Sequence, residues 1–568
     1  MISQRAGRIL AVAAAVVLAA GAAPSPADAG PTAAGHRRDI DVQLLALNDF
    51  HGALEPPSGL FFGVPAGGAE YLATQVRQLE EGKRNSIVVS AGDLIGASPL
   101  LSALFHDEPT IEAMNEIGLD LNAVGNHEFD EGAAELLRMQ RGGCHPVDGC
   151  LDGDPFRGAR FDFLAANVVR EDTGRTLFAP YEVKRFQGAK VAFVGMTLEG
   201  TPSIVTPAGV AGLEFKDEAD TVNALVPRLK RQGVESIVVL LHEGAVTTGG
   251  LNDCPGVSGP LVDLVARFHP EIDAVVSGHT HRTYNCALPN REGDPVLVTS
   301  AGSNGRAISR IDLTIDKRSR DVTSAAAENL VVTRDVAPAS DITALIAKYN
   351  EIAAPLRDRV IGSITDSIDK TPDASGETEA GDLIADAQLD ATDDAGFGDA
   401  QVALMNPGGV RDPGFVFDAP AGTGGTITYG EAFTVQPFGN SLVTMTLSGA
   451  QLYEVLDQQW CGQTAPRILA PSAGFTYTWD ESDPACEGDG KVVTGSVAID
   501  GVPVVADQTY RVTVNSFLAD GGDNFSVLRE GTDRLGGAVD LDALVAYFAA
   551  APGQTLSPPA LDRIEVQP

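Results

Sequence analysis

The chain has 568 residues, of which 44% are hydrophobic and 21% are charged. That length suggests two to four domains, and that composition excludes a disordered or fibrous protein. Acidic residues outnumber basic residues by 77 to 40, giving a net charge of −37. This charge repels nucleic-acid backbones and anionic membranes but is compatible with a small anionic substrate, because bound cations reverse the local sign.

Residues 1–29 have the pattern of a secretory signal peptide. Arg5 and Arg8 precede an apolar run at residues 9–20, and the Ala-Asp-Ala sequence at 27–29 fits the small-residue cleavage pattern. The run is short for a membrane-spanning helix, and no later stretch reaches 18 uninterrupted apolar residues. The sequence therefore predicts a secreted protein, extracellular or in the cell envelope, with no membrane insertion after cleavage.

Seven runs rich in Val, Ile and Leu predict strands buried on both faces. They alternate with helical or turn-rich segments, and residues 69–79 and 221–229 have helix-like apolar spacing. This alternation predicts an α/β domain, which we place at 40–335. The predicted strands are 42–47, 87–90, 121–124, 191–195, 237–241, 274–277 and 296–300.

The pattern changes near residue 336. Pro338, Ser340 and Asp341 resemble a helix start, and apolar residues then recur every three or four positions up to residue 356. We expect a connector helix within 336–361, ended or kinked by Pro355. The remainder, 362–568, has its own strands and glycine-rich turns, and this predicts a second domain.

The six cysteines lie in three local pairs: Cys144 with Cys150, Cys254 with Cys286, and Cys461 with Cys486. In an exported chain they predict disulfides, and pairing between neighbours is the connectivity we favour. None lies in a C-x-x-C motif, which argues against thiolate zinc binding and thioredoxin-like redox chemistry.

Five of the predicted strands are followed by residues of types that commonly bind metals. The motifs are Asn-Asp-Phe-His-Gly at 48–52, Gly-Asp at 92–93, Gly-Asn-His-Glu-Phe-Asp at 125–130, His-Glu-Gly at 242–244 and Gly-His-Thr-His at 278–281. Each motif alone is more typical of a turn or a cap. Ligands bind at the carboxyl ends of strands in open α/β sheets, so together the five favour a metal site. The other four histidines lack this context and receive no role: His36, His106, His145 and His269.

Carboxylate, amide and imidazole ligands without thiolate suit Zn, Mn, Co or Fe, with Mg or Ca as substitutes. More than four candidate ligands are too many for one tetrahedral ion. We therefore expect two adjacent divalent ions that share a bridging carboxylate. Such a pair clamps the attacking and leaving oxygens of an in-line displacement at phosphorus.

These five motifs, in this order, resemble the calcineurin-like metallophosphoesterase domain, and nearly the whole chain resembles the bacterial 5'-nucleotidase/UDP-sugar hydrolase family. The resemblance implies a sandwich of β-sheets flanked by helices, followed by an α+β domain. It implies that His127, held by Asp130, stabilises charge at the phosphate. It also implies one metal at Asp49, His51 and His281, another at Asn126, His242 and His279, and Asp93 as the bridge.

Three segments of the second domain resemble the family's nucleotide site: 406–411, 436–440 and 517–523. The resemblance implies that Phe438 and Phe517 sandwich the nucleobase, Asp523 accepts the ribose hydroxyls, Asn406 contacts the base and Arg411 grips phosphate. Without the resemblance, these residues are more typical of a core or a hairpin turn.

One feature departs from the family pattern. Relatives commonly carry an arginine upstream of the segment 376–383, whereas here Lys370 is the only basic residue between Arg359 and Arg411. A lysine supplies charge but no bidentate fork, so the grip on a substrate phosphate should differ.

We predict a secreted two-metal 5'-nucleotidase, monomeric or weakly oligomeric, in which a metal-bound hydroxide attacks phosphorus without a covalent intermediate. The alternatives within the enzymes are a UDP-sugar hydrolase or a 2',3'-cyclic nucleotide phosphodiesterase on the same scaffold. The alternative from another class is an inactive secreted nucleotide-binding protein. The sequence leaves open the preferred base, the number of phosphates and the metal.

Overall fold

The computed structural model describes residues 39–57, 59–205, 207–417, 425–483, 486 and 490–567. The predicted signal peptide lies outside these residues. Within them, no helix combines the length and the apolar character needed to cross a membrane.

The N-terminal part is built on two six-stranded sheets. The first has the order β14-β13-β1-β2-β3-β4 and the second has the order β11-β12-β10-β9-β7-β6. In the first sheet β1, β2, β3 and β4 are parallel, and β13 and β14 are antiparallel at one edge. In the second sheet the four central strands are parallel, and both edge strands are antiparallel. Their bounds are β1 Ile40–Leu47, β2 Ser86–Ser90, β3 Leu121–Ala123, β4 Asp162–Leu164, β6 Tyr181–Phe186, β7 Ala189–Thr197, β9 Ser236–His242, β10 Ala274–Ser277, β11 Thr283–Pro289, β12 Pro295–Ala301, β13 Ala307–Ile315 and β14 Val322–Val331.

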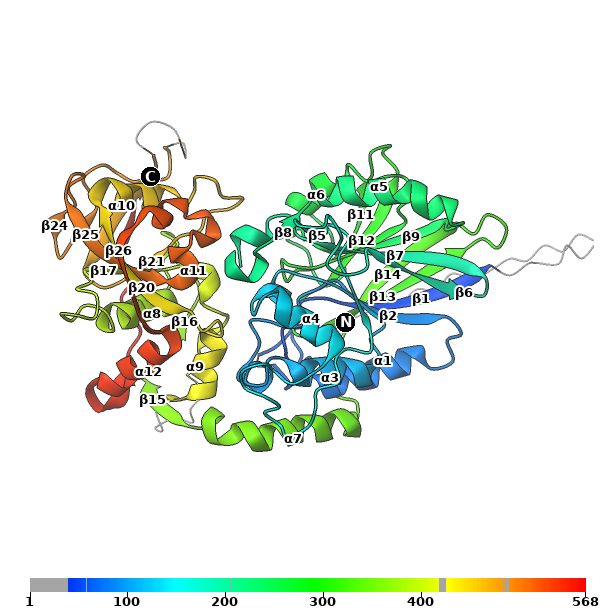
Figure 1. The fold of residues 1–568 in the computed structure, drawn as a ribbon, viewed down its shortest axis with the longest axis horizontal. Coiled ribbons are helices and arrows are strands. Elements are labelled where there is room, and N and C mark those ends of the chain that lie inside the picture. Colours follow the sequence, from blue (N-terminus) through cyan, green and yellow to red (C-terminus); the bar gives the residue numbers. More distant parts are fainter. Residues whose placement is uncertain are drawn as a thin grey trace, which may run out of the picture. The chain divides into compact units, whose positions relative to one another are not determined.

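Successive side chains of each strand point to opposite faces of its sheet, and this explains how the two sheets stack. Leu44 and Ala46 of β1 pack with Val238 and Leu240 of β9 in a core between the two sheets. Their sequence neighbours point to the outer faces, where helices cover them. Figure 1 shows α1 and α3 beside the first sheet and α5 and α6 beside the second. The helices of this part are α1 Ala69–Glu80, α2 Leu100–Ala103, α3 Glu108–Ile117, α4 Ala133–Arg141, α5 Glu218–Arg231 and α6 Pro260–Val265, and a small ribbon pairs β5 Val168–Arg170 with β8 Leu213–Phe215.

The predicted connector is α7, Ser340–Arg357. Pro355 lies within the last turn of α7, and the helix ends two residues later at Arg357. This agrees with the prediction that Pro355 ends or kinks the helix. Ile342, Ile346 and Tyr349 are buried against the N-terminal core, and the Tyr349 hydroxyl donates to Glu112 at 3.0 Å. The helix is therefore packed along most of its length.

The C-terminal part mixes helices with several smaller sheets. A five-stranded sheet has the order β21-β17-β25-β20-β26, and a four-stranded sheet has the order β24-β23-β22-β28. The strands are β15 Val360–Ile364, β16 Ile368–Asp369, β17 Val402–Met405, β18 Gly414–Phe415, β19 Gly425–Thr428, β20 Ser441–Ser448, β21 Ala470–Pro471, β22 Phe475–Asp480, β23 Ala498–Ile499, β24 Val502–Pro503, β25 Thr509–Asn515, β26 Thr532–Val539, β27 Thr555–Leu556 and β28 Ile564–Gln567. The helices are α8 Glu379–Asp390, α9 Tyr429–Val435, α10 Gly449–Asp457, α11 Ser516–Ala519 and α12 Asp540–Ala550.

The mixed α/β architecture confirms the predicted fold class, while the domain bounds remain a prediction. All six cysteines are paired, and the three disulfides join the neighbours that the sequence favours.

Candidate metal centre

The structure brings the seven predicted metal ligands together at the ends of five strands. They follow β1, β2, β3, β9 and β10, whose carboxyl ends meet at one edge of the two sheets. Five of them have backbone φ angles between 48° and 70°: Asp49, His51, Asp93, His279 and His281. Such a left-handed conformation costs a non-glycine residue about 1–3 kcal/mol, and residues of this kind gather at functional sites.

The first group of ligands comprises Asp49, His51 and His281. The Nε2 atoms of the two histidines lie 3.1 Å apart, and His281 Nε2 is 3.5 Å from Asp49 Oδ1. His51 Nδ1 donates to the Gly96 carbonyl at 3.0 Å, which leaves its Nε2 unprotonated in the neutral ring. Burial lowers the pKa of His51, and it lowers the pKa of His281 to about 3. Neutral imidazoles beside a carboxylate are a donor set that fits a divalent cation.

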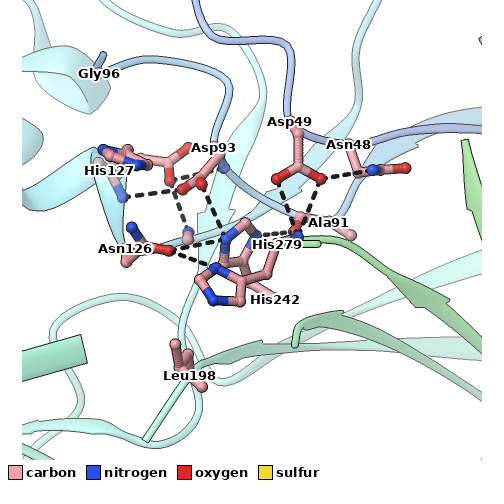
Figure 2. Close-up of polar contacts among 12 residues, drawn as sticks. Asn48, Asp49, Ala91, Asp93, Gly96, Asn126, His127, Leu198, His242 and His279 are labelled. Carbon is pink, nitrogen blue, oxygen red and sulfur yellow. Dashed lines mark hydrogen bonds and ion pairs between the residues drawn. The ribbon is translucent and has the colours of Figure 1, made fainter. Parts of the chain in front are cut away.

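The second group comprises Asp93, His242 and His279. His242 Nδ1 donates to the Ala91 carbonyl at 2.8 Å, and His242 Nε2 lies 3.0 Å from Asp93 Oδ2. Figure 2 shows the Asn126 amide oxygen directed at both rings, 3.1 Å from His242 Nε2 and 3.0 Å from His279 Nδ1. A backbone carbonyl that fixes the far nitrogen of an imidazole is the usual support of a metal-binding histidine. This group therefore also fits a divalent cation.

Asp93 lies between the two groups. Its Oδ2 is 3.0 Å from His242 Nε2 and 3.8 Å from His51 Nε2, while Oδ1 accepts from the His127 backbone N–H at 2.9 Å. Burial would raise the pKa of Asp93, but His242 and His127 hold it well below its usual range. A buried carboxylate anion in this place suits the predicted bridge, and that role remains a prediction.

Glu128 is a positioning residue that the sequence reasoning missed. Its side chain is buried and accepts from three backbone N–H groups, those of Asp93 at 2.9 Å, Leu94 at 3.0 Å and Gly125 at 2.7 Å. It thereby joins the loop that carries Asp93 to the loop that carries Asn126. The signal was available, because Glu128 lies inside the 125–130 motif.

His127 and Asp130 form the predicted pair. His127 Nδ1 donates to Asp130 Oδ2 at 2.9 Å, and the same oxygen accepts from the Ala97 backbone at 3.0 Å. Burial would lower the pKa of His127, but the charges of Asp130 and Asp93 raise it above its ordinary value. The Phe438 ring stacks on His127 with the centroids 5.9 Å apart.

A cavity of about 310 Å³ opens over the metal centre. Residues 39–568 form one compact unit, and side chains from both halves of it line this cavity. From the N-terminal half come Asp93, Asn126, His127, Asp130, His279 and His281. From the C-terminal half come all five predicted substrate residues: Asn406, Arg411, Phe438, Phe517 and Asp523.

The polar side of the cavity centres on Asp523, which is buried. Its Oδ2 accepts from Asn406 Nδ2 at 2.8 Å, and its Oδ1 accepts from Arg467 Nη1 at 2.6 Å. Asn515 in turn donates to Asn406 Oδ1 at 2.9 Å. Arg467 and Asn515 line the cavity but lie outside the motif residues selected from the sequence.

Lys370 lies near the predicted phosphate contact. Burial lowers its pKa, the charge of Asp412 opposes that shift, and the charge of Arg411 adds to it. Lys370 does not line the cavity. Its charge interacts with those of Arg411 and Asp412.

Two family models match the sequence. The calcineurin-like phosphoesterase model covers residues 42–283, and the model of the 5'-nucleotidase C-terminal domain covers residues 360–530. The chain belongs to the 5'-nucleotidase family. The crystal structure of a 5'-nucleotidase precursor from Thermus thermophilus is similar, with a TM-score of 0.75, 28% identity, and coverage of 93% of this chain and 99% of that one.

Two curated relatives are closer in sequence. Endonuclease YhcR of Bacillus subtilis is 33% identical over 89% of this chain and 39% of its own length. Cell wall protein Lmo0130 of Listeria monocytogenes is 34% identical over 88% of this chain and 66% of its own length. This chain thus spans less than two thirds of each of these two relatives.

Proposed function

We propose that this family member is a metal-dependent phosphoester hydrolase that acts as a 5'-nucleotidase. One observation carries the proposal. Four of the predicted metal ligands and the predicted nucleotide-binding residues line the same cavity. His127 and Phe438, whose predicted roles concern the phosphate and the base, are in direct ring contact there. A nucleoside monophosphate is a molecule that would use both sets.

We propose that two divalent ions, with Zn, Mn or Co preferred and Mg or Ca as substitutes, occupy the two ligand groups. The residues would be Asp49, His51 and His281 for one ion, Asn126, His242 and His279 for the other, and Asp93 for both. When bound, such ions activate a water nucleophile and neutralise charge on the phosphate.

The side chains around the ions position the phosphate and supply positive charge. Asp130 holds His127 through Nδ1, so its Nε2 is free to donate toward an oxygen of the phosphate. Arg411 lies beside the Phe438 ring, 5.8 Å from its centroid, and offers a bidentate fork. Lys370 adds charge close to Arg411 in place of the family's upstream arginine.

The nucleoside would bind at the C-terminal half. Phe438 and Phe517 are both half-buried, so each keeps part of its ring available for stacking. Arg467 and Asn406 hold the two oxygens of Asp523. These contacts fix its carboxylate where it could accept the ribose hydroxyls.

The name of the Bacillus relative raises a nucleic-acid polymer as a second substrate. The net charge of −37 opposes binding of a polyanion, and the cavity volume of about 310 Å³ is the size of a small-molecule site. UDP-sugars and 2',3'-cyclic nucleotides remain the alternatives on this scaffold. Against an inactive nucleotide-binding protein, the side chains that we propose as metal ligands lie close together in two groups.

A substrate panel tests the proposal. Protein stripped with a chelator and then reloaded with Zn, Mn or Co is assayed for phosphate release from nucleoside monophosphates, a UDP-sugar, a 2',3'-cyclic nucleotide and an oligonucleotide. We expect the highest kcat/KM for a nucleoside monophosphate and none without metal. Absence of monophosphate hydrolysis with every metal would refute the proposal, and faster hydrolysis of another substrate would replace it with that alternative.

We also propose that the mature protein acts outside the cell or in its envelope. The three disulfides suit an oxidising compartment. The proposed leader, 1–29, can be tested by N-terminal sequencing of protein recovered from the culture medium and the envelope fraction.

A further inference from the structure

A second set of metal-type side chains lies outside the cavity. One ligand atom from each of His106, Glu131, Glu135 and His145 lies within 4.8 Å of the others, and we name these residues the His106 cluster. His106 follows α2, the two glutamates flank the start of α4, and His145 follows its end. None of the four lines the cavity over the metal centre.

The two imidazoles of the cluster are in face-to-face contact. Their ring centroids lie 3.8 Å apart with an interplanar angle of 17°. His106 Nδ1 is 2.8 Å from Glu131 Oε2, so one nitrogen and one carboxylate oxygen already face each other at the centre of the cluster. Two protonated imidazoles stacked this closely would repel each other, whereas two neutral rings are suited to share one cation.

Asp148 contacts both rings. Its Oδ2 accepts from His106 Nε2 at 3.0 Å and lies 3.3 Å from His145 Nδ1, which accepts from the Asp148 backbone N–H at 3.2 Å. A carboxylate that accepts from Nε2 of His106 leaves Nδ1 of this ring, which faces Glu131, as a donor of electrons. Carboxylate–histidine–metal arrangements use this geometry to fix the tautomer of a ligand.

The cluster is held in place by contacts of its own. His145 and Asp148 lie in the loop that the Cys144–Cys150 disulfide closes, and a pair of backbone hydrogen bonds joins His145 to Gly149. Glu135 is held by Arg138 Nε, which is 2.9 Å from both of its oxygens. The side chains of His106, Glu135 and His145 are largely shielded from solvent, while Glu131 is more open.

We propose that the His106 cluster binds one divalent transition metal, with zinc as the ion that two imidazoles and two carboxylates suit. The competing explanation is that protons alone hold the cluster together as imidazole–carboxylate pairs.

A metal there would join three segments of the N-terminal part. His106 precedes Asp107, whose Oδ2 accepts from the Gly96 backbone at 3.0 Å, and Glu131 follows Asp130, which holds His127. The site would thus fasten the disulfide loop to two segments that support the cavity.

Zinc content tests the proposal on the full chain. Protein stripped with a chelator is dialysed against excess zinc and desalted, and zinc per chain is measured by elemental analysis. We expect His145→Ala and Glu131→Gln to hold one zinc fewer per chain than the wild type. The matched control is His269→Ala, which removes a histidine outside both sites and should keep the wild-type content.

Two further measurements keep the outcome clear. The melting temperatures of the zinc-free variants and zinc-free wild type should agree closely enough to show that the variants are folded. His145→Ala could disturb the loop that the Cys144–Cys150 disulfide closes. Glu131→Gln serves as the second variant because it keeps the shape of the side chain and lies outside that loop. If both variants keep the wild-type zinc content, or His269→Ala loses as much, the proposal is wrong and protons alone hold the cluster.

The result is independent of the proposed nucleotidase activity. Asp93→Asn should remove zinc from the centre at the cavity and leave the zinc of the His106 cluster in place. The zinc measurement on His145→Ala therefore gives an answer even if the protein has no phosphatase activity.

Discussion

Replacing Phe438 and Phe517 with alanine tests the division of labour inside the cavity. Phe438 lines the cavity and stacks on His127, and Phe517 packs beside Gly522 in the segment that leads to Asp523. If the rings sandwich a base, the variants should lose affinity for nucleotides and keep their chemistry. If they are core residues, the variants should lose stability.

Stacking of a base on an aromatic ring is worth about 1–3 kcal/mol. Because about 1.4 kcal/mol corresponds to a tenfold change, each ring should contribute about 5- to 150-fold to kcat/KM for a nucleotide. The double variant should lose less than the product of the two, because both rings would contact one base.

The assay compares a nucleoside monophosphate with a small aryl phosphate, which needs the metals but has no base to stack. We expect kcat/KM for the nucleotide to fall and that for the aryl phosphate to change by less than about threefold, a difference of roughly 0.6 kcal/mol. Phe397→Ala is the matched control, because Phe397 is exposed and outside the cavity. Wild-type kcat/KM for every nucleotide in the double variant would refute the base sandwich.

Four other changes have expected outcomes. Asp93→Asn should lower metal content in both ligand groups because a neutral amide bridges dications poorly, and two tightly held metals in this variant would contradict the bridge. His127→Ala should retain metal but slow turnover by about 10²–10⁴-fold, and full activity would remove His127 from the mechanism. Arg467→Ala should raise KM for nucleotides but not for an aryl phosphate, since Asp523 Oδ1 loses its partner while Oδ2 keeps Asn406; an equal change in both would show a general structural role. Burial raises the pKa of Asp540 to about 7. Between about pH 4 and pH 7 the folded state therefore holds a proton that the unfolded state has released. The free energy of unfolding falls as the pH rises through this range. Relative to the wild type, Asp540→Asn should gain up to about 1.4 kcal/mol per pH unit across that window and level off above it; thermal melts showing a constant difference would contradict this.

The strands at the centre of both sheets could be predicted because they are buried on both faces. The run 191–195 lies within β7, Ala189–Thr197, and 274–277 coincides with β10. The edge strand β14 was missed for the opposite reason. In β14, exposed and half-buried residues follow one another with almost no apolar run, so its pattern resembles a loop.

The candidate site shows the same division between local and distant information. Each predicted metal ligand directly follows an apolar run, so a short motif carries both the position and the chemistry. Arg467 could not be found in this way, because its contact with Asp523 joins residues 56 positions apart and neither the loop nor its neighbours mark it. The His106 cluster is a similar case, assembled by a disulfide loop and two helix ends rather than by a strand motif.

The charge of the protein implies a second role for the proposed metals, in attracting the substrate. The chain carries a net charge of −37, and the centre and its cavity contain four carboxylates, those of Asp49, Asp93, Asp130 and Asp523. Against these, the cavity lining offers Arg411, Arg467 and a charged His127, and Arg467 is already paired with Asp523. Burial would lower the pKa of His242, but the charge of Asp93 raises it to about 10, so this ring adds a fourth cation. A phosphate dianion entering the metal-free cavity would therefore meet no excess of positive charge. The two dications that we propose would add four positive charges where Asp49 and Asp93 lie, and this would make the local charge positive. The acidic composition that opposes binding of polymeric nucleic acid is thus compatible with a small phosphate ester, provided that the ligand groups hold their ions.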